Sequence, residues 1–231
     1  SEYAFIDFAT SQMAKVSSNI SDHKTFTKRA FSYGNLTCHD NRYLSVFAPH
    51  DVSGIINTFG RETFIDRLEK SIEGSLRHVE PGKITPDMIR QIRYSGQYNI
   101  EQSPLQAAWL FNYAGVPWLT QKWTREIMSG YSSGDACIIT PGLDPAQAGA
   151  LFVMSAIGLF QTNGGTSAEP FYEIGSPLFK KATIHLDGRF YPGGEFIILA
   201  ENTTDKNRYI RGATLDGTVL DKPWFSQSEL A

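Results

Sequence analysis

Two acidic residues lie directly before segments that are expected to be helices. Glu101 precedes the stretch Ser103-Pro104-Leu105-Gln106, and Asp144 opens Asp144-Pro145-Ala146-Gln147. Hydrolysis of a glycosidic bond needs two carboxyl groups, one to protonate the leaving oxygen and one to activate water or attack the sugar. A helix N-terminus favours an ionised carboxylate, which suits a base better than an acid. The pattern of Asp144, followed by Pro and Gln, favours a helix cap, whereas Glu101 could equally be a solvated loop residue.

Aromatic side chains near these two acids are a second chemical feature. The rings of Trp109 and Trp118 could stack on a sugar, or they could fill a hydrophobic core, as aromatic residues at helical spacing often do. Motifs typical of other enzymes do not occur: the sequence has no Gly-rich phosphate loop, no nucleophile elbow and no HExxH. Residue types alone therefore indicate only a soluble globular chain with a helical core and a β tail.

The elements that must position these residues are helices up to about residue 161. Apolar periodicity predicts helices at residues 3–18, 23–33, 50–59, 61–76, 105–113, 118–128 and 144–159, and a short one at 86–92. The first two form an αα-hairpin. On the first helix the predicted apolar face consists of Ala4, Phe5, Phe8, Ala9, Met13 and Val16. Gly115 is predicted to end the helix at 105–113.

Beyond residue 161 the pattern changes to short strands. Apolar and polar residues alternate at 183–186, 195–200, 209–213 and 218–220, between turns that contain Asp-Gly or Gly-Gly pairs. The sequence therefore predicts an α+β fold, mainly α. Residues 1–161 form the helical-hairpin part, and residues 162–231 form an antiparallel β segment that packs on it.

Composition excludes several classes of function. The chain has 231 residues, 41% of them hydrophobic, and a formal net charge of −3. This charge gives no broad attraction to nucleic acid or to an anionic membrane, and no apolar run reaches the length of a membrane span. The N-terminal residues show no signal-peptide pattern, so a secreted protein would have lost its signal or carried it on a longer precursor.

Three sequons for N-glycosylation begin at Asn19, Asn35 and Asn202, each in an expected loop or turn. They favour a glycoprotein of the secretory pathway or the extracellular space. Cys38 and Cys137 could form one disulfide there, or remain two buried thiols.

A series of short stretches, running in order from about residue 45 to residue 225, carries a more specific pattern. They are APHDVSG (48–54), QAAWLFNYAG (106–115), PW (117–118), TQKW (120–123), PG (141–142), SAIGLF (155–160), IGSPLF (174–179), AEN (200–202) and DKPW (221–224). Together they resemble the glycoside hydrolase family 92 α-mannosidases.

This resemblance implies a fold and an activity. Members of the family combine an N-terminal β-sandwich with an (α/α)6 barrel, and they are calcium-dependent exo-α-mannosidases that invert the anomeric centre. Their acid is a Glu in an Asn-Glu-Pro motif ahead of the LFNYAG helix, and their base is an Asp ahead of the last barrel helix. The resemblance thus implies Ca²⁺, if the family's site is retained, and a mannose-containing glycan as ligand.

Both catalytic motifs depart from the family pattern. Counting back without gaps from the LFNYAG helix puts Gln102 at the acid position, whereas a shift of one residue puts Glu101 there. An amide cannot donate a proton as a carboxylic acid does. Asp144 matches the base, but Gly142 or Leu143 replaces the neighbouring acid.

Two functions follow from this comparison. The first is a non-catalytic, mannosidase-derived subunit with a structural role in a complex, because both motifs are degraded. The matched part corresponds to only the latter portion of such an enzyme, so we expect a further chain or larger assembly to cover the exposed apolar face. The alternative is the C-terminal chain of an active, calcium-dependent inverting α-mannosidase that acts on N-glycans, with Glu101 as acid and Asp144 as base.

Overall fold

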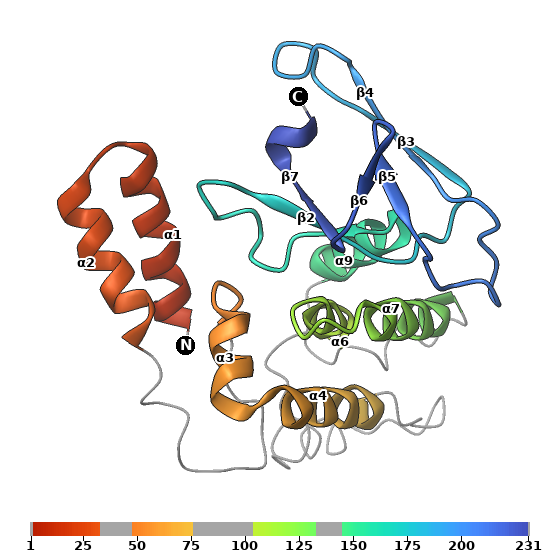
Figure 1. Ribbon diagram of the computed structural model, residues 1–231, viewed down its shortest axis with the longest axis horizontal. Helices are drawn as coiled ribbons and strands as arrows, with labels where there is room; N and C mark the ends of the chain where they lie inside the picture. Colours follow the sequence, from red (N-terminus) through yellow and green to blue (C-terminus); the bar gives the residue numbers. More distant parts are fainter. Residues whose placement is uncertain (1, 33–47, 76–103, 133–144, 231) are drawn as a thin grey trace.

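The computed structural model describes residues 2–32, 48–75, 104–132 and 145–230 of the chain. Within these ranges the helices come first in the sequence, and short antiparallel strands follow from residue 159 (Figure 1). The predicted fold class, α+β and mainly α, is confirmed. No helix among these residues has both the length and the apolar character that a membrane span requires. The helix predicted at 86–92 and both cysteines lie outside the described residues.

The N-terminal hairpin consists of α1 (Glu2–Val16) and α2 (Ile20–Ala30), which pack against each other as predicted (Figure 1). Asn19 caps α2, because its Oδ1 accepts a hydrogen bond from the Asp22 N–H at 3.2 Å.

The predicted apolar face of α1 is wrong in part. Met13 is 73% exposed and Val16 is 72% exposed. The buried side chains of α1 are those of Ala4, Asp7, Phe8, Ser11 and Ala14. At about 100° per residue, Met13 points to the side opposite Ala4. Polar positions belong to the buried stripe because Asp7 pairs with Arg29 of α2 at 3.1 Å.

The next two helices are α3 (Val52–Phe59) and α4 (Arg61–Ser75), with Gly60 between them. Asp51 begins α3 by accepting the Gly54 N–H on its Oδ1 at 3.0 Å. On α4 the apolar side chains recur every four residues, so one face of the helix is buried, as predicted for an amphipathic helix.

The predicted helix at 105–113 is two elements in the structure. One α-helical turn, α6 (Pro104–Ala107), continues as the 3₁₀ segment η2 (Ala108–Asn112). Three residues per turn bring Trp109 and Asn112 to the same side of η2. Gly115 ends the segment as predicted and has φ +68°, a conformation that a side chain disfavours. Helix α7 (Pro117–Ser132) follows.

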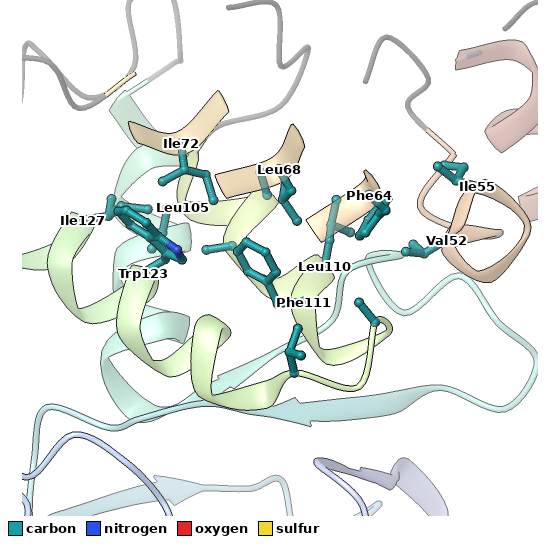
Figure 2. Close-up of a cluster of buried hydrophobic side chains, with 14 of the residues drawn as sticks. Val52, Ile55, Phe64, Leu68, Ile72, Leu105, Leu110, Phe111, Trp123 and Ile127 are labelled. Atoms are coloured by element: carbon teal, nitrogen blue, oxygen red, sulfur yellow. The ribbon is translucent and has the colours of Figure 1, made fainter. Parts of the chain in front are cut away.

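The hydrophobic core lies where α4, α6, η2 and α7 meet (Figure 2). Figure 2 shows Phe64, Leu68 and Ile72 of α4 pointing toward the side chains of α6, η2 and α7. Those opposite are Leu105, Leu110, Phe111, Trp123 and Ile127. The core residues that come from the LFNYAG stretch are nearly inaccessible to solvent. Helices α4, α6 and α7 and the η2 segment therefore form a rigid, closely packed base.

The last helix, α9 (Pro145–Ile157), packs on α6 and α7 and leads directly into the strands. Strand β1 (Leu159–Phe160) pairs with β2 (Phe171–Ile174), and β2 pairs with β7 (Trp224–Ser226). This antiparallel sheet, in the order β1-β2-β7, was not predicted. Its strands are short, and β2 and β7 are far apart in the sequence, so no local turn signal marks their pairing.

Two hairpins complete the β segment, and a 3₁₀ turn, η3 (Gln227–Leu230), follows β7. Strand β3 (Lys181–His185) pairs with β4 (Glu195–Leu199), close to the predicted strands. Strand β5 (Ala213–Leu215) pairs with β6 (Thr218–Leu220). The strand predicted at 209–213 is wrong, since only its last residue is in β5. The two-residue turn Asp216-Gly217 connects β5 to β6 and fixes their register. Strand β5 therefore lies next to this turn, at residues 213–215, and not at 209–213.

Polar side chains of α7 join the helices to the β segment. The guanidinium of Arg125 donates to the Pro177 carbonyl at 2.7 Å and to the Thr204 carbonyl at 3.0 Å. Gln121 Oε1 accepts the Ile210 N–H at 2.9 Å. These contacts connect the two parts of the chain, while the predicted division at residues 161 and 162 stays a prediction.

Candidate functional site

The three residues predicted for catalysis, Glu101, Gln102 and Asp144, lie outside the described residues. The structure does describe the helices that follow them. Helix α6 begins at Pro104 and α9 begins at Pro145, and the two helices pack against each other. Both predicted acid positions therefore precede helices of the same packed layer. Their assignment as acid and base stays a prediction.

Trp109 is fully buried in the structure. Its ring stacks on Phe160 with the centroids 5.3 Å apart, and its Nε1–H donates to Ser155 Oγ at 3.2 Å. A Cβ atom at Gly175 would lie 2.4 Å from this ring, so only glycine fits there. These contacts are those of a core residue, the alternative that the sequence left open, and they offer no free ring face to a sugar.

Trp118 stands at the start of α7 and is 51% exposed. An exposed indole can stack on a sugar or on another protein. Its role as a substrate-binding residue stays a prediction.

The sequons differ in their surroundings. Asn19 caps α2, and its Nδ2 donates to the Asp22 carboxylate at 2.8 Å. Asn202 is exposed in a turn and has φ +56°. Asn35 lies outside the described residues.

A buried carboxyl group that the sequence analysis missed lies between η2 and the three-stranded sheet. Glu173, in the central strand β2, is 1% exposed. Its Oε1 accepts the Tyr113 O–H at 3.0 Å and the Thr162 N–H at 3.1 Å. Among the described residues no basic side chain forms an ion pair with it. The aromatic ring of Phe171, two residues earlier on the same strand, packs edge-on against Tyr113 and covers this region.

Burial raises the pKa of Glu173 to about 7. The Tyr113 hydroxyl and the Thr162 N–H, which donate to the carboxyl, and the nearby Asn112 amide oppose this rise, because these polar groups stabilise the ionised form. Burial also raises the pKa of Tyr113 well above its usual range, and the neighbouring Glu173 carboxylate adds to this, so the phenol remains a donor. The Glu173 carboxyl can therefore hold or release a proton near neutral pH. Since it is inaccessible, we assign it to the interior of the fold and not to a ligand site.

The signal for this carboxyl was present in the sequence. Phe171 and Glu173 are two residues apart, so their side chains point to the same face of a strand. An acidic residue that shares a face with an aromatic residue, next to Ile174, is unusual for a solvated strand. Only the tertiary structure, however, identifies Tyr113 as its partner.

Calcium takes six to eight oxygen ligands, usually with several carboxylates among them. Within the described ranges, no three acidic, histidine or cysteine side chains lie close enough to hold a metal ion. Glu173 contributes one carboxylate surrounded by neutral groups and does not fit this requirement. We therefore assign no calcium ligand and no step through calcium to these residues.

Comparison with known proteins identifies the scaffold. The model of the glycosyl hydrolase family 92 catalytic domain matches residues 39–231. No curated protein sequence matches the chain.

Solved structures of family 92 enzymes match over nearly the whole chain. One is a family GH92 α-mannosidase from Bacteroides thetaiotaomicron, with 25% identity, a TM-score of 0.71, and coverage of 99% of this chain and 33% of that chain. Another is a family GH92 inverting mannosidase from the same organism, with 24% identity, a TM-score of 0.71, and coverage of 98% and 35%. A complex of the first enzyme with mannoimidazole matches with 23% identity, a TM-score of 0.71, and coverage of 99% and 34%.

The chain thus spans about a third of the length of these solved relatives. Their agreement with its backbone confirms the predicted fold, the helical-hairpin part of a family 92 barrel followed by an antiparallel β element. The match to the family model covers most of the sequence, including every core helix from α3 onward. The chain belongs to glycoside hydrolase family 92.

Proposed function

We propose that this chain is a non-catalytic family 92 subunit, derived from an α-mannosidase, with a structural role in a larger assembly. One observation carries the proposal: Gln102 occupies the acid position when the sequence is counted back without gaps from the LFNYAG stretch. An amide has no acidic proton to give to the leaving oxygen. The segments that follow this position in the sequence, α6 and η2, are meanwhile closely packed in the core.

Exposed apolar side chains on the N-terminal hairpin support the structural role. Those of α1 are Tyr3 (82% exposed), Ile6, Met13 and Val16, and Ile20 of α2 is exposed beside them in the sequence. Apolar residues gathered on one element favour contact with another protein surface. We propose a further protein chain or a larger assembly as that surface.

The alternative is an active chain of a calcium-dependent inverting exo-α-mannosidase, with Glu101 as acid and Asp144 as base. Two features favour it: Glu101 is one residue from the acid position, and Asp144 directly precedes α9, which packs against α6. In this case the two carboxyl groups would be about 6.5–9.5 Å apart, with a water between them.

Mannose release separates the two functions. Natively purified protein is incubated with an α-1,2-linked mannose disaccharide, with added Ca²⁺ or with a chelator. We expect no release from the unaltered protein. Chelator-sensitive release that Glu101→Gln abolishes would overturn the non-catalytic proposal and establish the alternative.

The Gln102→Glu variant sharpens this test. If the missing acid is what silences the site, this substitution restores a carboxylic acid where the family has one, and calcium-dependent release should appear. Glu101→Gln in the same background is the matched control, and it should leave the restored activity in place.

We also propose that the protein is located in the secretory pathway or outside the cell. The three sequons support this, and the exposed Asn202 is the acceptor we expect to be modified. Treatment of the natively purified protein with an N-glycan-removing amidase should lower its mass, and Asn202→Gln should remove that shift. An unchanged mass would contradict both statements.

A further inference from the structure

The region around Glu173 contains several polar atoms whose hydrogen-bonding capacity the described residues do not satisfy. These buried atoms are Glu173 Oε2, Thr162 Oγ1, and Nδ2 and Oδ1 of Asn112. Their residues are all at least nine-tenths buried. Native proteins leave fewer than about 10% of such buried atoms without a partner. Four of them on three neighbouring residues therefore require an explanation.

Direct contacts show that the three residues share one location. The Thr162 N–H donates to Glu173 Oε1 at 3.1 Å, so the Thr162 hydroxyl stands beside the same carboxyl group. Tyr113 donates to that oxygen at 3.0 Å, and Asn112 precedes it on η2. The Asn112 amide and the Thr162 hydroxyl also face the carboxyl closely enough to lower its pKa. The unsatisfied atoms therefore surround Glu173 from the η2 side and from the turn after β1.

We propose that Asn112, Thr162 and Glu173 form a binding site for one internal water molecule, which joins η2 to the central strand of the sheet. A buried water makes about three hydrogen bonds, within a range of two to four. Here it would donate to Glu173 Oε2 and to Asn112 Oδ1. It would accept from the Thr162 hydroxyl or from Asn112 Nδ2, whichever is oriented toward it.

The chemistry of the site favours water over a cation. Only three of the unsatisfied atoms are oxygens, and only one belongs to a carboxylate. Calcium takes six to eight oxygen ligands. The fourth atom, Asn112 Nδ2, is a hydrogen-bond donor, which repels a cation and suits a water oxygen. A water molecule, which both donates and accepts hydrogen bonds, can pair with oxygen acceptors and with an N–H donor alike.

The position of the site gives this water a structural role. Asn112 belongs to the family's LFNYAG stretch, and Glu173 belongs to the strand that pairs with both β1 and β7. A water between them would extend the direct Tyr113–Glu173 hydrogen bond into a network. The helical layer and the sheet would then be connected here both by the direct Tyr113–Glu173 hydrogen bond and through the water.

A crystal structure of the full chain at a resolution that shows ordered water is the direct test. We expect one density peak within 2.6–3.2 Å of at least three of the four atoms, a range typical of hydrogen bonds. Direct contacts from Asn112 and Thr162 to Glu173 with no such peak would overturn the proposal. A peak with five or more oxygen ligands, which indicates a cation, would overturn it too.

Oxygen-17 magnetic relaxation dispersion, which counts long-lived internal waters, provides a test in solution. We expect the Thr162→Val variant, which replaces the hydroxyl by a methyl group of similar size, to show one long-lived water fewer than the unaltered protein. Thr166→Val is the matched control, because the Thr166 hydroxyl donates to the Asn163 carbonyl and not, among the described residues, to Asn112, Thr162 or Glu173, and it should keep the water. An equal count in all three folded proteins, verified by circular dichroism, would overturn the proposal.

Discussion

Two of the buried polar side chains that join the helices to the β segment, Arg125 and Glu173, do so in opposite ways. Arg125 reaches from α7 to the β segment and binds two backbone carbonyls with its guanidinium. Glu173 reaches from β2 to η2 and accepts donors from Tyr113 and Thr162. The Arg125 side chain is 6% exposed and Glu173 is 1% exposed, so each group is separated from most solvent.

The difference lies in what each group can do when it is desolvated. Burial lowers the pKa of Arg125, but a guanidinium remains charged at every pH at which proteins fold. Its charge must therefore be met by acceptors, here the carbonyls of Pro177 and Thr204. A carboxyl group can instead take up a proton and become neutral, and burial favours that form of Glu173. We call the contacts of Arg125 with the two carbonyls the Arg125 joint, and those of Glu173 with Tyr113 and Thr162 the Glu173 joint. The Arg125 joint is thus independent of pH, and the stability of the Glu173 joint should depend on pH.

The largest effect should come from breaking the Arg125 joint. Arg125→Met keeps much of the aliphatic stem but removes the donors to Pro177 and Thr204. We expect the free energy of unfolding in urea to fall by about 3 kcal/mol, because charged hydrogen bonds are lost and two acceptors remain unpaired. The control is Lys122→Met on the same helix, whose contact with Glu69 is at 3.5 Å and partly exposed; it should cost less than about 1 kcal/mol. Equal losses in the two variants would contradict this role.

The pH dependence of the Glu173 joint should be nearly as large. The pKa of Glu173 is about 7 in the folded protein, against an ordinary value of 4.5. Between these values the folded protein binds more protons than the unfolded chain, so stability falls as pH rises through this range and levels off above it. A pKa difference of about 2.5 corresponds to roughly 3 kcal/mol.

Unfolding in urea at pH 5, 6, 7 and 8 tests this dependence. Glu173→Gln has no ionisable group at this position, so the difference in unfolding free energy between it and the unaltered protein should change by roughly 3 kcal/mol across the series. The exposed Glu169 lies nearby in the sequence, and Glu169→Gln should leave the slope unchanged. A Glu173→Gln profile parallel to that of the unaltered protein would show that Glu173 stays ionised throughout.

Much of the helical part could be predicted from the sequence because its signals are local. The Asp51 cap, the end at Gly115 and the four-residue spacing on α4 act within one or two turns of helix. The same local logic failed on α1, where the polar Asp7 and Ser11 belong to the buried stripe. Asp7 pairs with Arg29 of α2, and the Ser11 hydroxyl donates to the Phe8 carbonyl of its own helix. Polar residues that are paired across a hairpin cannot be distinguished from solvated ones by periodicity alone.

The polar joints could not be predicted, because their partners are far apart in the sequence. Tyr113 and Glu173 are 60 positions apart, and Arg125 and Thr204 are 79 apart. Strand β2 was equally hidden, since β7 pairs with it across a long separation and no two-residue turn connects them. The catalytic assignment, in contrast, stays a prediction. It rests on the family motif, and its residues, Glu101, Gln102 and Asp144, lie outside the described part of the chain.

A smaller effect should follow from removing one donor of the Glu173 joint. Tyr113→Phe deletes the hydroxyl that donates to Oε1 and should lower the free energy of unfolding by about 1–2 kcal/mol. Because this hydrogen bond opposes the effect of burial, its loss should also raise the pKa of Glu173 above its value of about 7. The chemical shift of the Glu173 carboxyl carbon, followed by NMR as a function of pH, measures that change.

Tyr172 is the matched control for this substitution. It neighbours Glu173 on β2, but its ring stacks on Phe225, on the other side of the strand from the carboxyl. Tyr172→Phe should leave the titration of Glu173 in place. If Tyr113→Phe also leaves it in place, the phenol does not stabilise the carboxylate, and the joint depends on Thr162 and Asn112.

The smallest effect should come from Asp205, the one carboxylate that pairs with Arg125 among the described residues. The distance from Arg125 Nη2 to Asp205 Oδ1 is 3.6 Å, and the Asp205 side chain is fully exposed. Water screens a charge in that position, so Asp205→Asn should change the free energy of unfolding by less than about 0.5 kcal/mol. A larger loss, comparable with that of Arg125→Met, would mean that Arg125 requires its counter-charge. If the effect is small, the two carbonyls alone hold the buried guanidinium, and the two joints then differ only in whether the buried group can become neutral.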